Sequence, residues 1–180
     1  MRTLFVSVLV SLVTLGACTS SQSPSEKVDY TQLVNPFVGT DFTGNTYPGA
    51  QAPFGMVQLS PDNGLAGWDR ISGYFYPDST IAGFSHTHLS GTGAGDLYDI
   101  LFMPVTLPYN ETAEGGLGIH SKFSHNDEEA SAGYYRVKLQ DYDINVELTA
   151  TPRCGVQRYT FPKAESMVVL NLKKAMNWDF

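Results

Sequence analysis

The sequence has few cysteines and few basic residues. Its 180 residues include two cysteines, Cys18 and Cys154, and only 11 lysines and arginines against 18 aspartates and glutamates. The formal net charge of -7 disfavours binding to the phosphate backbone of a nucleic acid, so we expect no nucleic-acid partner.

Helical periodicity is also missing. Outside the first 17 residues, no window of 11 residues has apolar side chains at helical spacing. Short apolar runs alternate instead with glycine and proline, which is typical of β-strands joined by turns. We expect strands at MVQL (56–59), GYFY (73–76), IAGF (81–84), DILFMP (99–104), VQRYTF (156–161) and MVVLNL (167–172).

A β-hairpin is the clearest element of the sequence. Segments 134–140 and 144–150 each alternate apolar with polar residues, and Asp141 to Asp143 separates them. This pattern predicts two antiparallel strands with one buried face. The fold class that follows is all-β, an antiparallel β-sandwich. The alternating apolar residues are Val137, Leu139, Ile144, Val146 and Leu148.

The N-terminal segment is typical of an export signal. Residues 1–17 contain one basic residue and then an uncharged run from Leu4 to Ala17, which is too short to span a bilayer comfortably. The tetrapeptide LGAC resembles the bacterial lipobox, in which the signal is cut before a cysteine that receives lipid. We expect a lipoprotein signal peptide at 1–17, lipidation at Cys18, and an exported bacterial lipoprotein anchored in a membrane, periplasmic or at the cell surface. An ordinary secretory signal followed by a chance cysteine is the alternative.

Two regions follow the signal. The serine-rich residues 18–29 predict a flexible tether, and residues 30–180 predict the β-sandwich domain. Because the chain stops directly after an expected strand, we expect this domain to be cut short at its C-terminal end. If Cys18 carries lipid, Cys154 has no partner for an intrachain disulfide, and we expect it to be a small buried apolar residue.

The segment GFSHTHLSGTGAGDLYDI, residues 83–100, joins two histidines to a glycine-rich run and two aspartates. On a strand, His86 and His88 would point to one face and could share a metal ion with Asp96 or Asp99. Histidines held by ordinary hydrogen bonds are the alternative. The glycines lack the spacing and the following lysine of a phosphate loop, but they leave backbone N–H groups free for a polar, uncharged ligand.

Trp68 lies in a second informative loop, GLAGWDR, residues 64–70. A tryptophan in a loop either plugs the edge of the core or offers a platform for the apolar face of a sugar ring. In the second case Asp69, Asn45 and the two histidines would bond to sugar hydroxyls.

Four segments together resemble the N-terminal β-sandwich domain of the glycoside hydrolase family 92 α-mannosidases, over roughly residues 30–178. They are VNPFVGT, GNTYPGAQAPFGMVQLSPD, GWDRISGYFYPDSTIAGFSHTHLSGTGAGDLYDILFMP and VQRYTF.

The resemblance implies a calcium-dependent exo-enzyme that removes α-linked mannose from glycans with inversion, and we expect an α-1,2 linkage. In this family an (α/α)6 domain follows the sandwich and supplies the general acid, the general base and the calcium ligands. This chain is therefore expected to contain no catalytic residue and no metal ligand, and to be inactive alone.

The resemblance also implies that Trp68 is the tryptophan that packs on the sugar. It places His86, His88 and the Gly44-Asn45 turn near the same cleft. The candidate substrate-binding residues are thus Trp68, Asp69, His86, His88, Gly44 and Asn45. The expected partners are a mannose-containing glycan, the (α/α)6 domain and a membrane. A lipid-anchored carbohydrate-binding module without catalysis is the alternative function, and a metalloenzyme built on the two histidines is a third.

Overall fold

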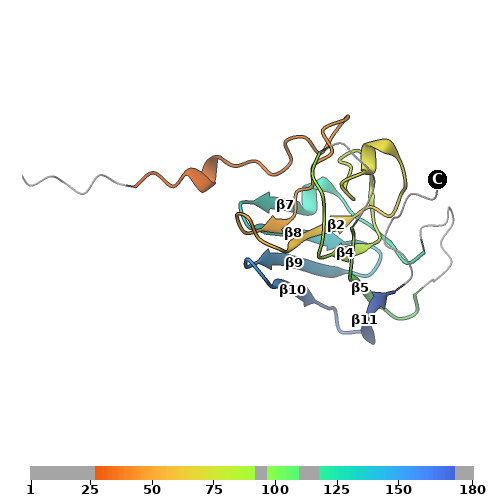
Figure 1. Cartoon of the computed structure of the whole chain (residues 1–180). Coiled ribbons are helices and arrows are strands. Elements are labelled where there is room, and N and C mark those ends of the chain that lie inside the picture. The colour runs from red at the N-terminus through yellow and green to blue at the C-terminus, as the bar shows by residue number, and fades with distance from the viewer. Residues whose placement is uncertain (1–26, 92–96, 110–117, 173–180) are drawn as a thin grey trace, which may run out of the picture.

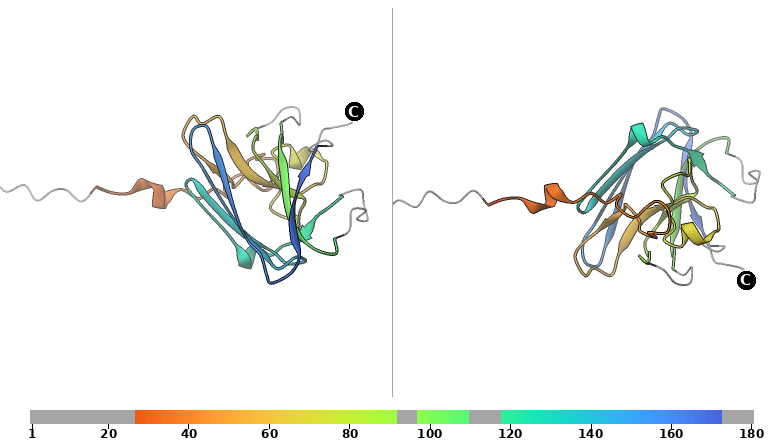
Figure 2. Two further views of the ribbon diagram at one scale, coloured as in Figure 1. Left: turned by 90° about the horizontal axis from the view of Figure 1, so that it is seen from below. Right: turned by 90° about the horizontal axis from the view of Figure 1, so that it is seen from above.

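Two antiparallel β-sheets form the framework of the protein (Figure 1). The computed structural model describes residues 27–91, 97–109 and 118–172. One sheet has five strands in the order β1-β2-β4-β5-β11, the other has four in the order β10-β9-β8-β7, and β3 pairs with β6 in a separate ribbon. Figure 2 shows the two sheets as layers inclined to each other. The prediction of an all-β sandwich is confirmed.

The strands are short in the first half of the chain and longer in the second. The five-stranded sheet contains β1 (Ala50–Gln51), β2 (Gln58–Asp62), β4 (Gly83–Ser85), β5 (Leu101–Thr106) and β11 (Ser166–Asn171). The four-stranded sheet contains β7 (Glu128–Ser131), β8 (Tyr134–Leu139), β9 (Ile144–Ala150) and β10 (Gly155–Thr160). The ribbon is β3 (Thr80–Ile81) with β6 (Ser121–Lys122). The described part of the chain also contains the 3-10 turns η1 (Tyr30–Leu33), η2 (Trp68–Arg70) and η4 (His125–Asp127).

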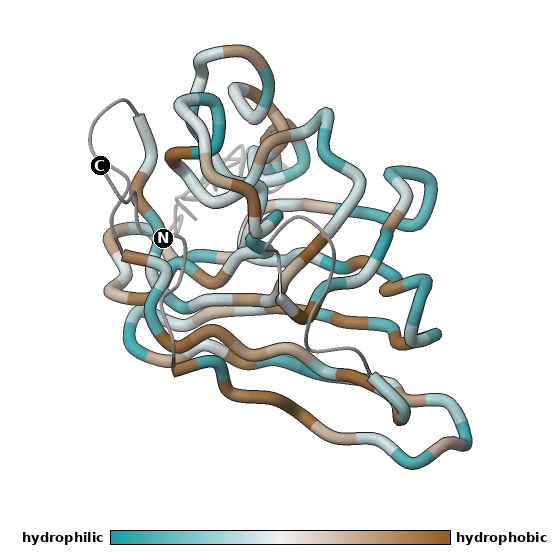
Figure 3. The backbone as a smooth tube through the Cα atoms, turned by 90° about the vertical axis from the view of Figure 1, so that its right-hand side faces the viewer, coloured by the Kyte–Doolittle hydropathy of each residue, from teal (hydrophilic) through white to brown (hydrophobic). Residues whose placement is uncertain are grey.

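The predicted hairpin is confirmed as β8 and β9. Leu139 pairs with Ile144 and Val137 with Val146, so the alternating apolar residues share one face. All of them are buried, and burial of each such side chain stabilises the fold by about 1.5–3 kcal/mol. This alternation of hydrophobic and hydrophilic residues along strands is visible in Figure 3.

The opposite face of the four-stranded sheet is polar. A row of alternating charges crosses all four strands in register: Arg136 pairs with Glu129 on one side and with Glu147 on the other, and Glu147 pairs with Arg158. Arg136 and Glu129 form an ion pair at 2.8 Å, and Arg158 bonds to Glu147. These charges face solvent, and each finds its counterion on the neighbouring strand.

Most of the predicted strands are present, with shifted ends. The segments 156–161 and 167–172 correspond to β10 and β11, and 99–104 overlaps β5. The segment 81–84 is divided between β3 and β4, and 56–59 contributes only its last two residues to β2.

The prediction of a strand at GYFY, residues 73–76, is wrong. Gly73 has φ +86°, and its carbonyl accepts a hydrogen bond from the N–H of Asn63 (2.9 Å), so the chain turns there. Tyr74 is fully buried for a different reason than strand packing: its hydroxyl donates to the carboxylate of Glu128 at 3.0 Å from both oxygens.

The prediction of a buried Cys154 is also wrong. Cys154 is exposed in the turn between β9 and β10, where its N–H donates to Thr151 Oγ1 (3.0 Å). Its carbonyl accepts from the N–H of Thr151 (2.8 Å). The backbone of Cys154 therefore closes a tight polar turn, which places the thiol outside the core.

The N-terminal part of the described chain lies away from the sheets (Figure 1). No residue of η1 is buried, and the first buried side chain is that of Thr40. The predicted signal peptide, the lipidation site Cys18 and most of the tether lie outside the described residues. Among the residues that are described, there is no helix with the length and apolar character needed to cross a membrane.

Candidate functional site

Three loops carry most of the candidate residues, and backbone hydrogen bonds join them. The loop before β1 (39–49) contacts the loop after β2 (63–79), because Tyr76 N–H donates to the Thr40 carbonyl at 2.9 Å. Ser72 Oγ donates to the Thr46 carbonyl at 2.9 Å between the same two loops. The loop after β4 joins them through the Gly91 N–H, which donates to the Asn45 carbonyl at 2.7 Å. The three loops, which flank strands of the five-stranded sheet, therefore form one structural unit.

The Gly44-Asn45 turn is tightly constrained. A Cβ atom on Gly44 would lie 2.2 Å from the carbonyl oxygen of Gly39, so no other residue fits there without moving the backbone. Asn45 has φ 50° and is 2% exposed, and its side-chain Oδ1 has no hydrogen-bond partner. An acceptor buried without a partner costs about 1–3 kcal/mol, which an incoming donor would recover.

His88 is a buried structural residue. Its Nδ1 donates to the carbonyl of Gln58 (2.7 Å), and its Nε2 lies 2.9 Å from Oδ1 of Asp62. Asp62 Oδ2 in turn accepts from the N–H of Ser85 (3.1 Å), and the rings of Tyr47 and His88 are 5.1 Å apart. Both ring nitrogens of His88 are thus engaged within the protein, and the histidine ties the loop after β4 to β2.

His86 lies in a different environment from His88. Its Nδ1 donates to the carbonyl of Ile100 (3.1 Å), and its ring meets Phe102 edge-on at 5.6 Å. A Cβ atom on Gly155 of β10 would come within 2.9 Å of the His86 ring, so this ring lies against the other sheet. The two histidines have different neighbours, and the described residues around them do not support a metal ion shared between them.

No described part of the chain brings together three or more histidine, cysteine, aspartate or glutamate side chains that could hold a metal ion. Asp96 lies outside the described residues, and Asp99 is exposed and accepts a hydrogen bond from Thr87 Oγ1 (3.1 Å). The side chains that the structure describes therefore do not fit a calcium site.

Trp68 opens the short 3-10 turn η2 in the loop after β2. Its side chain is 54% exposed, which argues against the alternative that it plugs the core. The turn is closed by the Arg70 N–H, which donates to the Gly67 carbonyl at 3.0 Å, and continues through the Gly73 N–H to the Arg70 carbonyl at 2.9 Å. Asp69 is half-buried beside Trp68.

The buried polar residues that hold this loop were not predicted from the sequence. Asn63 is fully buried; its Oδ1 accepts from the Phe75 N–H (2.6 Å), and its Nδ2 donates to the Thr80 carbonyl (2.7 Å). Arg70 forms a two-pronged ion pair with Asp78. The tripeptide Asp62-Asn63-Gly64, which ends β2 and begins the next loop, was the available signal, since Asp and Asn in turns commonly bond to backbone groups.

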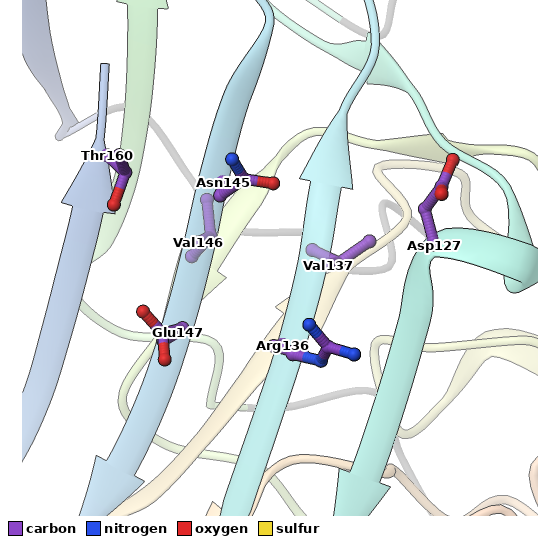
Figure 4. A pocket seen from close by; sticks show the side chains of 7 residues that line it. All are labelled: Asp127, Arg136, Val137, Asn145, Val146, Glu147 and Thr160. Atoms are coloured by element: carbon purple, nitrogen blue, oxygen red, sulfur yellow. The ribbon is translucent and has the colours of Figure 1, made fainter.

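A hollow of about 330 Å³ lies on the outer face of the four-stranded sheet (Figure 4). Two of its charged side chains, Arg136 and Glu147, belong to the cross-strand row described above and already have counterions, and the third, Asp127, comes from η4. The hollow is therefore a solvated sheet surface, separate from the loops that carry Trp68. Its lining residues are Asp127, Arg136, Val137, Asn145, Val146, Glu147 and Thr160.

Comparison with known proteins assigns the family. Residues 33–180 match the model of the glycosyl hydrolase family 92 N-terminal domain. The chain belongs to glycosyl hydrolase family 92. The resemblance seen in the sequence is thereby confirmed, and the loops described above are those of a family 92 N-terminal domain.

Solved family 92 enzymes have the same fold. An α-mannosidase from Bacteroides thetaiotaomicron, solved alone and in complex with mannoimidazole, is 44% identical with a TM-score of 0.75, and the match covers 79% of this chain and 20% of that one. An inverting mannosidase from the same organism is 32% identical with a TM-score of 0.63, over 81% of this chain and 20% of that one.

A fungal relative gives similar coverage. An uncharacterized secreted glycosidase of Arthroderma benhamiae is 28% identical over 156 residues, which are 84% of this chain and 20% of that protein. This chain thus spans about a fifth of the length of these relatives.

Proposed function

We propose that this domain forms one wall of the sugar pocket of a larger α-mannosidase. That enzyme removes α-linked mannose from glycans and inverts the anomeric carbon. Its main target is the α-1,2 linkage. The observation that carries the proposal is Trp68, a half-exposed indole on a braced turn within a family 92 N-terminal domain. The indole face is an apolar platform on which a pyranose ring packs.

The polar candidates have distinct roles in this proposal. Asp69 bonds to a sugar hydroxyl, and Asn45, whose Oδ1 is buried without a partner, borders the pocket and offers an acceptor to a hydroxyl that displaces the loop covering it. The tight turn at Gly44 presents Asn45. His86 and His88 act by fixing the backbone that surrounds the pocket, since their Nδ1 atoms bond to carbonyl oxygens of the protein.

Catalysis belongs to sequence beyond this domain. An inverting glycosidase needs two carboxyl groups about 6.5–9.5 Å apart, one as general acid and one as general base for a water. We propose that an (α/α)6 domain supplies both, together with the calcium ligands that the described residues do not provide. We further propose export, lipidation at Cys18 and attachment to a membrane.

Hydrolysis of an aryl α-mannoside by two proteins tests the proposal. A product extended to the length of its relatives should release mannose, which NMR should detect first as the β-anomer, whereas the 180-residue chain alone should be inactive. Turnover by the short chain that a point substitution within it abolishes would contradict the proposal. Calorimetric titration with mannobiose tests the carbohydrate-binding module: binding by the short chain, with no hydrolysis by the extended product, would favour that alternative.

A further inference from the structure

We propose that Arg70 and Asp78 are positioning residues for Trp68. This inference rests on the proposed function, in which the Trp68 indole packs on the sugar. In this role the ion pair holds the Trp68 indole, which lies on a short exposed turn, in one orientation. Arg70 is two residues from Trp68 within η2, and Asp78 lies at the far end of the same loop, just before β3.

The ion pair between the two side chains has a geometry that fixes direction. Arg70 Nε donates to Asp78 Oδ2 at 2.6 Å, and an Nη atom of the same guanidinium donates to Oδ1. Two parallel bonds between planar groups define both distance and angle, which a single contact does not. The side chain of Asp78 is 7% exposed and that of Arg70 is 21% exposed, so solvent screens the pair only weakly.

Further contacts hold the two partners in place. The guanidinium carbon of Arg70 lies 4.7 Å from the centroid of the Phe75 ring, within the range of a cation–π contact. The Asp78 N–H donates to the Phe75 carbonyl (3.0 Å), and Asn63 anchors the Phe75 N–H (2.6 Å). The carboxylate that receives Arg70 is therefore carried on a segment that a fully buried residue fixes to the end of β2.

The two ends of η2 are held differently. Its C-cap, Ile71, is fully buried, and Ser72 Oγ donates to the Thr46 carbonyl at 2.9 Å, so the C-terminal end is anchored in the core. None of the three residues of η2 itself is buried, and its N-cap, Gly67, has no side chain to cap the turn. The Arg70–Asp78 pair is the ionic attachment that the structure shows for the residues of η2 themselves.

A double-mutant cycle on the extended, active enzyme tests the inference. We would measure kcat/KM for an aryl α-mannoside with the wild type, Asp78→Asn, Trp68→Ala and the double variant. Asp78→Asn keeps the size of the side chain but weakens the bidentate pair, and we expect kcat/KM to fall on the order of 10-fold through misplacement of the indole. In the Trp68→Ala background, the same substitution should change kcat/KM less than about 2-fold.

The non-additive result separates positioning from a general loss of folded enzyme, which would lower activity equally in both backgrounds. Arg70→Lys, which keeps the charge but loses the planar fork, serves as a milder second variant in the same cycle if Asp78→Asn folds poorly. Glu129→Gln, which removes an exposed carboxylate from the opposite sheet, is the control and should leave kcat/KM unchanged.

The outcomes are distinct. Equal effects of Asp78→Asn with and without Trp68, or no effect on the wild type, would overturn the positioning role while the proposed function stands. No effect of Trp68→Ala would refute the proposed function itself, and the positioning role with it.

Discussion

Glu128 is the most heavily bonded buried carboxylate among the described residues, and its removal should be costly. Its side chain is 1% exposed. It accepts hydrogen bonds from the hydroxyls of Tyr135 (2.6 Å) and Tyr74 (3.0 Å), and it lies 2.6 Å from Nδ1 of His125. Both tyrosines are fully buried, so without Glu128 their hydroxyls lose this acceptor in the core.

The expected loss in the free energy of unfolding follows from these contacts. A buried polar group that loses its partner costs about 1–3 kcal/mol, and Glu128→Ala orphans two buried hydroxyls and removes one partner of the partly exposed His125. Partial relaxation of the site reduces the sum, so we expect the free energy of unfolding to fall by about 3–5 kcal/mol. Replacing Glu128 by leucine together with Tyr74→Phe and Tyr135→Phe removes donors and acceptor at once, and it should cost much less than the single change.

Urea unfolding of the 180-residue chain, followed by circular dichroism, is the assay. Glu129→Ala is the matched control, because the neighbouring carboxylate is 53% exposed and pairs with a similarly exposed arginine, an arrangement worth about 0–1 kcal/mol. If Glu128→Ala and Glu129→Ala destabilise the chain equally, Glu128 does not hold the core together and the reasoning fails.

Three further predictions follow from the structure and the sequence. Burial raises the pKa of Tyr74 and Tyr135 above the ordinary value of 10.0. The stability that their neutral forms contribute is therefore present below pH 10 and lost as the pH rises further. The double variant Tyr74→Phe, Tyr135→Phe should show a shallower decline of the urea midpoint above pH 10. Cys18→Ser should move the protein from the membrane fraction to the soluble fraction, and unchanged partitioning would contradict lipidation. Strand β11 is an open sheet edge with Val168 and Leu170 exposed, so we expect poor solubility of the short chain, and Leu170→Lys should raise the soluble yield.

The fold could be predicted where one face of the chain meets the core and the other meets water. Strands β8 and β9 were predictable because Val137, Val146 and Leu148 alternate with polar residues. The segment 73–76 was not, because its one buried aromatic residue, Tyr74, is held by a long-range partner: its hydroxyl donates to Glu128, 54 residues later. Local hydrophobicity cannot distinguish such burial from a strand.

The candidate site could be predicted only in part. Trp68 was singled out because a tryptophan in a glycine-bearing loop is unusual, and the structure shows it half exposed; its binding role stays a prediction. The role of His88 was not predictable, since its partner Asp62 is 26 residues earlier in the sequence. Glu128 was missed because it lies in an acidic run with Asp127 and Glu129, which suggests a solvated surface, although it has the same register on β7 as the buried Val137 on β8.

The kinetics of Trp68→Ala in the extended enzyme test the central claim most directly. If the indole packs on the sugar, kcat/KM for an α-mannoside should fall by about 5- to 150-fold, from a loss of about 1–3 kcal/mol of side-chain burial. The melting temperature should change little, because the side chain is already half exposed. Tyr30→Ala, at an aromatic residue that is 70% exposed and away from the sheets, is the control and should change neither quantity. Unchanged kcat/KM with a clearly lowered melting temperature would contradict the account, because Trp68 would then support the fold and not the pocket.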